Sequence, residues 1–206
     1  MHFPVINMCP TEENIGKSFY AMQDGTRLRH WCLLAEIIDG FKEDGILMLE
    51  VRDAAREKCF VAFRDKNDQY GGHQFVDPDI TSESRKMKGR KTIAILYPIL
   101  RYDLPGNRKG FIIDDISNFT PIPHSIVELY DANDRLREVA TECCLSGCSQ
   151  KENLKACSVC YVVKYCGRDH QTKHWKVHKP ECKANEALRW FTQRDWTHYD
   201  SKFSFP

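Results

Sequence analysis

Seven of the ten cysteines of this 206-residue chain fall between Cys143 and Cys182, and three of its eight histidines lie in the same stretch. The stretch holds few aliphatic side chains, and so short a segment cannot bury enough apolar surface to fold alone. Thiol and imidazole groups that lie close together can instead bind metal, which then supplies the free energy of folding. We therefore expect a metal-stabilised module in this part of the chain.

The rest of the composition is that of a globular protein, with 42% hydrophobic and 29% charged residues and a formal net charge of +1. The first residues lack the basic start and apolar core of a signal peptide, and no apolar run approaches the ~20 residues that span a bilayer. We therefore expect an intracellular protein, nuclear or cytoplasmic, that does not act on membranes. In such a reducing compartment, clustered cysteines favour metal binding over disulfides.

Potential ligands occur in this cluster as four closely spaced pairs. The pairs are Cys144-x3-Cys148, Cys157-x2-Cys160, Cys166-x3-His170 and His178-x3-Cys182. A two-residue gap in a tight turn lets both thiolates reach one ion, and a three-residue gap on a helix places both ligands on one face. Because structural zinc takes four ligands in a tetrahedron, eight ligands predict two zinc ions per chain.

The second half of the cluster has a more specific pattern. It reads Cys157-x2-Cys160, then Tyr165-Cys166-x3-His170-Gln171-x3-Trp175-x2-His178-x3-Cys182, and it resembles the MYND-type zinc finger. The resemblance implies that the pairs interleave. One zinc would be bound by Cys144, Cys148, Cys166 and His170, and the other by Cys157, Cys160, His178 and Cys182. The resemblance also implies a protein-interaction module of an adaptor or transcription regulator, which binds a proline-containing peptide through a surface that includes Gln171 and Trp175.

The chain departs from the family pattern in its ligands and loops. His170 stands where the family usually has cysteine, but imidazole is an acceptable zinc ligand. The first pair has three intervening residues instead of two, and Cys143 beside it could be the ligand; we expect Cys144. The loop from Cys160 to the next ligand is one residue longer than usual. His174 could compete as a ligand, but the family pattern makes it a spacer.

Residues 27–123 are predicted to form a small β-barrel domain. The predicted strands are 31–38, 46–51, 59–63, 91–97 and 111–119, with Cys32 and Cys59 as small core residues and Pro121 ending the sheet. A long polar connection separates the third and fourth strands. This strand order resembles the OB-fold, a partly open Greek-key barrel, and a charged Arg52-Asp53 turn fits it; an SH3-like barrel or a small sandwich is the alternative.

The fold class is therefore predicted as α+β, with five consecutive segments. They are an irregular, loosely ordered lead-in (1–26), the OB-like barrel (27–123), a linker helix (124–142), the MYND-type finger (143–183) and a tail (184–206). Ser125 is the expected N-cap of the linker helix. Gly167 and Pro180 are expected to limit the regularity of the helix in the finger.

Two other function classes were weighed. Nucleic-acid binding by the barrel would use Arg85, Lys86, Lys88, Arg90 and Lys91 with Phe60, Phe63, Tyr97 and Tyr102. It is not favoured, because residues 1–140 carry 22 acidic against 19 basic side chains.

Catalysis is not expected either. No nucleophile–base pair is readable, a SET methyltransferase domain would need more chain, and Gly16-Lys17-Ser18 lacks the rest of a phosphate-binding loop. The oligomeric state stays open.

Overall fold

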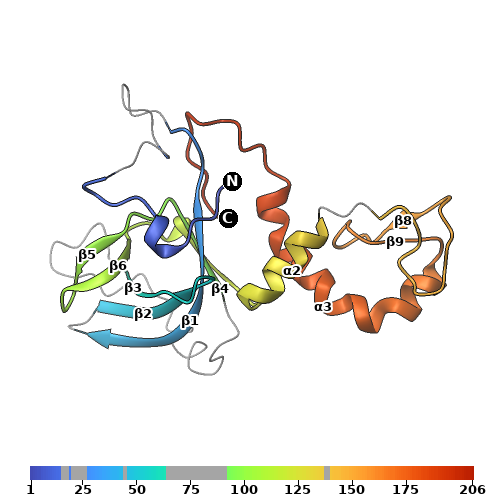
Figure 1. Cartoon of the computed structure of the whole chain (residues 1–206), viewed down its shortest axis with the longest axis horizontal. Helices are drawn as coiled ribbons and strands as arrows, with labels where there is room; N and C mark the ends of the chain where they lie inside the picture. Colours follow the sequence, from blue (N-terminus) through green and yellow to red (C-terminus); the bar gives the residue numbers. More distant parts are fainter. Residues whose placement is uncertain (15–18, 20–26, 44–45, 64–91, 137–139) are drawn as a thin grey trace. The chain divides into compact units, whose positions relative to one another are not determined.

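The computed structural model describes residues 1–14, 19, 27–43, 46–63, 92–136 and 140–206 (Figure 1). The chain forms two compact units. The first contains Met1–Ile126 together with Asp195–Pro206, and the second contains Val127–Arg194. The second unit is therefore an insertion into the first, and the chain leaves the first unit and later returns to it.

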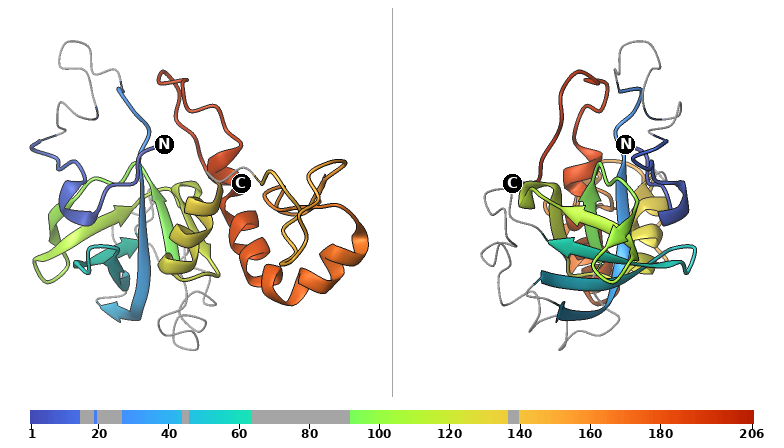
Figure 2. Two further views of the ribbon diagram at one scale, coloured as in Figure 1. Left: turned by 45° about the vertical axis from the view of Figure 1, so that its right-hand side comes forward. Right: turned by 90° about the vertical axis from the view of Figure 1, so that its left-hand side faces the viewer.

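The first unit contains a seven-stranded sheet in the order β5-β6-β3-β2-β1-β4-β7 (Figures 1 and 2). Its elements are η1 (Ile6–Met8), β1 (Cys32–Glu43), β2 (Ile46–Asp53), β3 (Lys58–Phe63), β4 (Thr92–Leu96), β5 (Arg101–Leu104), β6 (Arg108–Ile113), η2 (Ile116–Asn118) and β7 (Phe119–Ile122). The β3–β6 pair is parallel and the other described pairs are antiparallel. The chain runs from β6 through η2 into β7, and β6 pairs with β3 while β7 pairs with β4. This one stretch of chain therefore pairs with both sides of the sheet and closes it into a partly open, OB-like barrel.

The predicted strands are confirmed, with three differences. The segment 111–119 is divided between β6 and β7 by η2, whose N-cap Asp115 accepts hydrogen bonds from the backbone and side chain of Ser117. The strand β5 was not predicted. Pro121 does not end the sheet but lies in β7 opposite Ile93. Since β7 lies at one end of the strand order, a residue without an N–H is tolerated there.

Alternate side chains of the strands form the barrel core, as the two-residue period of a strand requires. The core includes Leu33, Ala35 and Ile37 of β1, Leu49 and Val51 of β2, Cys59, Val61 and Phe63 of β3, and Ile93 and Ile95 of β4. Cys32 is fully buried as well, so both predictions of a core cysteine are confirmed. Burial raises the pKa of the Cys59 thiol to about 12, which keeps it protonated.

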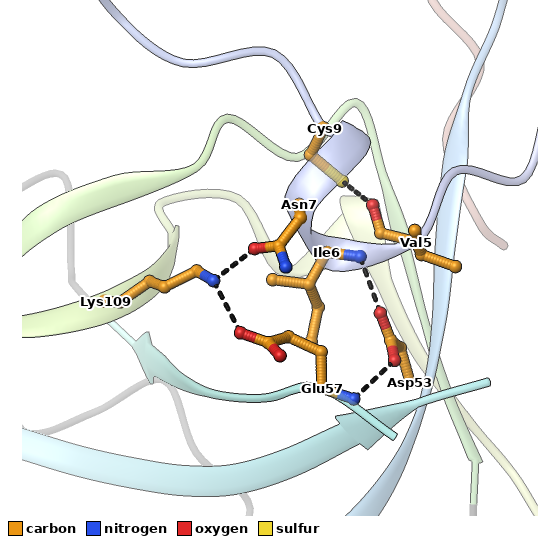
Figure 3. Close-up of polar contacts among 7 residues, drawn as sticks. All are labelled: Val5, Ile6, Asn7, Cys9, Asp53, Glu57 and Lys109. Carbon is orange, nitrogen blue, oxygen red and sulfur yellow. Dashed lines mark hydrogen bonds and ion pairs between the residues drawn. The ribbon is translucent and has the colours of Figure 1, made fainter. Parts of the chain in front are cut away.

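The first fourteen residues are not the loosely ordered lead-in that the sequence suggested. Ile6 is fully buried, and its backbone N–H donates to the Asp53 carboxylate at 2.7 Å (Figure 3). The second carboxylate oxygen of Asp53 accepts from the N–H of Glu57 at 2.9 Å, and Lys109 contacts Asn7 and Glu57 (Figure 3). The segment is therefore fixed by contacts distant in sequence. The candidate phosphate loop at 16–18 lies outside the described residues.

The second unit consists of short elements and one long helix. They are α2 (Ile126–Leu136), which starts at the last residue of the first unit, β8 (Lys155–Ala156), β9 (Lys164–Tyr165) and α3 (Arg168–Thr192). The expected linker helix 124–142 is shorter, since residues 140–142 are not helical. Pro180 lies inside α3, and the helix continues past the expected boundary at 183. No described helix has the length and apolarity needed to cross a bilayer.

The first unit holds the chain on both sides of the insertion. On the outgoing side, the N–H of Ile126 donates to Glu36 of β1 at 3.4 Å, and Thr92 Oγ1 donates to the carbonyl of His124 at 2.8 Å. On the returning side, the N–H of Phe205 donates to the carbonyl of Ser117 at 2.7 Å. The expected tail 184–206 is thus divided between the end of α3 and a segment packed on the barrel unit.

Candidate metal centre

The first cluster of ligands joins a loop to the start of α3. Its members are Cys143, Cys148, Cys166 and His170. Nδ1 of His170 lies 3.2 Å from Sγ of Cys166 and 3.5 Å from Sγ of Cys143. The sulfurs of Cys148 and Cys166 are 3.9 Å apart. Gly167 is the N-cap of α3, so the cysteine before it and the histidine in the first helical turn approach the same point.

The second cluster joins the turn before β9 to the middle of α3. Its members are Cys157, Cys160, His178 and Cys182, and all four are buried. The sulfurs of Cys157 and Cys182 are 3.8 Å apart, and Nε2 of His178 lies 3.6 Å from Sγ of Cys160. His178 and Cys182 flank Pro180 and lie four residues apart, on one face of the helix. Binding of both ligands to one ion would hold α3 together across the proline.

These separations fit zinc. Tetrahedral zinc with Zn–S bonds of ~2.3 Å and Zn–N bonds of ~2.0 Å places its ligand atoms about 3.5–3.8 Å apart. The ligand atoms of each cluster lie within 4.8 Å of one another, and both clusters contain three thiols and one imidazole. The two tetrads are consistent with two structural zinc ions. Each zinc site, with its three thiolates, would carry a formal charge of −1. Each ion would have four protein ligands, which leaves no position for a catalytic water.

The tetrads interleave along the chain, as the resemblance implied. The first takes its ligands before and after the Cys157–Cys160 pair, and the second takes its last two from farther along α3. Such cross-bracing ties the loop, the hairpin and the helix to one another. A short segment with a small apolar cluster around Val162 and Val163 is thereby given a defined fold.

One ligand prediction is corrected. Cys143, rather than the expected Cys144, belongs to the first tetrad. Cys143 is 3% exposed, whereas Cys144 lies outside the tetrad and its sulfur is 4.0 Å from the carbonyl of Glu142. Both backbone N–H groups are bonded, that of Cys143 to the carbonyl of Gln150 and that of Cys144 to the carbonyl of Lys164.

His174 lies outside both tetrads, where a spacer was expected. Its Nδ1 lies 2.9 Å from the hydroxyl of Tyr165, and its ring stacks on His178 with centroids 6.3 Å apart. Burial, followed by nearby thiols, raises the pKa of Tyr165, so the hydroxyl stays protonated and can share a hydrogen bond with His174. This contact joins β9 to α3 beside the second tetrad, and the sequence pattern gave no sign of it.

The two residues proposed for partner binding lie on one side of α3. Gln171 and Trp175 are four residues apart and therefore neighbours on the helix surface. Trp175 is 40% exposed, and its ring meets that of His178 edge to face at 5.8 Å. Trp175 therefore packs against a ligand of the second tetrad while part of its ring stays on the surface.

Two of the four aromatic residues considered for nucleic-acid binding are buried. Phe63 and Tyr97 are buried, and Phe63 packs edge to face on Phe119 in the barrel core. Phe60 is partly buried beneath the guanidinium of Arg108, while Tyr102 is 61% exposed. The basic candidates Arg85, Lys86, Lys88, Arg90 and Lys91 lie outside the described residues.

Two interleaved tetrads of three cysteines and one histidine, carried by a hairpin and a helix, define a cross-braced two-zinc finger. Residues 142–182 match the family described as MYND finger. This segment of the chain is therefore a MYND finger, and MYND fingers are protein-interaction modules.

Similar segments occur in longer proteins. This chain is 52% identical over 42 residues to the Histone-lysine N-methyltransferase ASHR1 of Arabidopsis thaliana, which covers 20% of this chain and 9% of that protein. It is 49% identical over 53 residues to the Histone-lysine N-methyltransferase SMYD3 of Homo sapiens, covering 26% and 12%. The match to Egl nine homolog 1 of Mus musculus is 43% over 42 residues, covering 20% and 10%. The chain thus spans about a tenth of the length of these relatives.

The β-rich unit is similar to a chain in the crystal structure of the S. pombe Stn1-ten1 complex, with a TM-score of 0.33 and 14% identity. This match covers 55% of the present chain and 73% of the other.

Proposed function

We propose that this protein is an adaptor whose zinc-stabilised finger binds a short, proline-containing segment of a partner protein. The observation that carries the proposal is the placement of Trp175. Its ring packs against the zinc ligand His178 and is nevertheless 40% exposed. An aromatic face held rigidly at a surface is a low-entropy anchor for a proline ring, because neither group must be ordered on binding.

Gln171 complements this anchor. It lies one helical turn before Trp175, and its amide can both donate and accept a hydrogen bond. A polyproline II segment leaves its backbone carbonyls unpaired, so an amide beside an aromatic ring suits such a ligand. The two side chains together supply one apolar and one polar contact.

The proposal is tested by titrating proline-containing peptides into the zinc-loaded protein in a calorimeter. Trp175→Ala should weaken binding at least about tenfold, since a central aromatic anchor contributes more than ~1 kcal/mol. Val177→Ala is the matched control, because Val177 is 61% exposed and lies two residues away on another side of α3. Equal binding by wild type and Trp175→Ala would contradict the proposal.

We further propose that the protein acts without catalysis and in the nucleus or cytoplasm. Four protein ligands on each zinc support a structural role, and thiolate zinc sites suit a reducing compartment. The two relatives that are named as methyltransferases match this chain over 9% and 12% of their own length, so their activity is not part of this proposal.

Single-stranded nucleic-acid binding by the barrel is the second candidate, supported by the cation–π contact of Arg108 with Phe60 at 5.2 Å. It is weaker, because two of the four proposed aromatic platforms are buried. A fluorescence titration with labelled single-stranded DNA and RNA at low salt tests it. Salt-sensitive binding lost in Arg108→Ala would establish this function, and absence of binding would remove it.

A further inference from the structure

The segment Asp195–Pro206, which we call the return strap, packs on the first unit through aromatic side chains. Its rings surround His30, which precedes β1 and is 1% exposed. The centroid of the His30 ring lies 5.7 Å from Trp196, 5.5 Å from Tyr199 and 5.0 Å from Phe203. The strap therefore covers a histidine that would otherwise be open to solvent.

Hydrogen bonds connect the same histidine to the strap at two points. The hydroxyl of Tyr97 accepts the N–H of Phe203 at 3.0 Å and lies 2.7 Å from Nδ1 of His30. Nε2 of His30 lies 3.0 Å from the carbonyl of His198. A carbonyl can only accept, so Nε2 carries the proton; Nδ1 of the neutral ring then accepts from Tyr97. The network of bonds is complete only when His30 is neutral.

The surroundings oppose a positive charge on this ring. Burial lowers the pKa of His30; the bond to the His198 carbonyl raises it in part, and Arg27 and the Met1 amino group lower it further. Arg27 and Lys202 lie over the Tyr97 ring at 5.5 and 6.0 Å.

The strap also contains two aspartates, Asp195 and Asp200, and one further imidazole, that of His198. Asp200 is exposed. Asp195 bonds to Thr197 and lies 3.4 Å from Nε2 of His198, so its charge is directed at its own segment. The stacked ring of Tyr199 would attract an imidazolium, at an energy of order 1 kcal/mol for a partly exposed pair. Against this, a protonated Nδ1 can no longer accept from the Tyr97 hydroxyl, and it places a third cation beside Arg27 and Lys202.

We propose that His30 is a pH-sensitive latch: neutral His30 holds the return strap on the barrel, and protonation releases it. The insertion Val127–Arg194 contains the finger and is joined to the first unit on both sides. Release would leave it attached through the Ile126 side alone. Lys202 also lines a cleft of about 500 Å³ between β4 and β6, which release of the strap would open. The latch is independent of what the finger binds.

The sign of the pH dependence follows from linkage. His30 has a lower pKa when the strap is docked than when it is released. The docked state is therefore most stable above the ordinary histidine pKa of ~6.5. Below that value the equilibrium for release rises about tenfold per pH unit, until the docked histidine itself protonates.

The test is amide hydrogen exchange of Phe203 and Phe205 in the zinc-loaded chain, at about pH 7.5 and about pH 5.5, corrected for the intrinsic pH dependence of exchange. Zinc content is measured at both pH values. We expect the opening equilibrium of the strap to rise by up to about tenfold while β1 and β4 stay protected. Unchanged protection of the strap at the lower pH would overturn the proposal.

Three variants identify the group responsible. His30→Gln presents an N–H and an oxygen but takes up no proton, and should abolish the pH dependence. His198→Gln, which removes the exposed imidazole of the strap, should retain it. Tyr97→Phe removes the shared hydroxyl and should open the strap at both pH values, which keeps the proposal testable if His30→Gln does not fold. A Tyr97→Phe strap as protected as wild type would count against the latch, as would a pH dependence lost only in His198→Gln.

Discussion

The Asp53 carboxylate accepts a hydrogen bond from the backbone N–H of Ile6 at 2.7 Å, across 47 residues of sequence. Its other oxygen accepts from Glu57, and Asp53 is 3% exposed. One buried carboxylate thus joins the first residues of the chain to the turn between β2 and β3 (Figure 3).

Asp53→Ala should destabilise the barrel unit by about 3 kcal/mol, because two buried backbone donors lose a charged acceptor. The measurement is urea unfolding followed by a probe of the β-rich unit. Asp39→Ala is the matched control, since Asp39 is exposed and its carboxylate accepts from the N–H of its neighbour Gly40; its effect should stay within ~0.5 kcal/mol. Equal losses in both variants would show that the Asp53 bonds contribute little.

The two zinc ions should leave the protein at different rates. All four ligands of the second tetrad are buried, whereas only Cys143 of the first is buried and the other three are partly exposed. A chelator reaches the first site more readily, so we expect a fast phase and a slow phase of equal amplitude. The measurement is absorbance of a zinc-sensitive chelator over time. Cys143→Ser should remove the fast phase alone, and a single phase for wild type would contradict the assignment.

Removal of both zinc ions should unfold the finger and leave the barrel folded. The tetrads draw their ligands from residues 143–182, while the barrel has its own apolar core around Leu33, Val61 and Ile95. Amide exchange before and after chelation distinguishes the two units. We expect loss of protection in α3 and retained protection in β1 and β4. Simultaneous loss in both would mean that the barrel depends on metal.

The core thiols should resist alkylation over a wide pH range. Burial raises the pKa of Cys9 and of Cys59 to about 12, with the charge of Asp53 also raising that of Cys9. Only the thiolate is nucleophilic, so these two cysteines should react far more slowly than an ordinary thiol of pKa ~8.5. Because the pKa of each buried thiol is raised in the folded state, the protonated thiols stabilise the folded state below the ordinary thiol pKa. This stabilisation is lost as the pH rises toward 12. Mass spectrometry after brief alkylation of the native protein measures how far each cysteine is labelled. Rapid labelling of Cys59 at neutral pH would contradict its burial.

The sequence allowed prediction of features that depend on local spacing. Ligand pairs such as Cys157-x2-Cys160 and strands such as 46–51 follow from short-range patterns, and the structure contains both. The choice between Cys143 and Cys144 depends instead on which way the loop turns. In that loop, Gly147 has a φ of +82° and the N–H of Cys148 bonds to the carbonyl of Leu145.

Long-range contacts were beyond sequence reasoning. The burial of Ile6 depends on Asp53, and the packing of residues 195–206 depends on His30 and Tyr97, more than 100 residues earlier in the chain. No periodicity within residues 1–14 or 195–206 signals these contacts, because each segment packs through a few side chains and single backbone bonds. The first segment was therefore expected to be irregular, and the second was expected only as part of a tail.

Two interleaved zinc sites, with Cys143 as the first ligand, define the finger. Elemental analysis of zinc per chain in wild type, Cys143→Ser and Cys144→Ser tests this assignment. We expect two zinc ions for wild type, two for Cys144→Ser and fewer than two for Cys143→Ser. Two zinc ions retained in Cys143→Ser with loss in Cys144→Ser, or fewer than two in wild type, would contradict it.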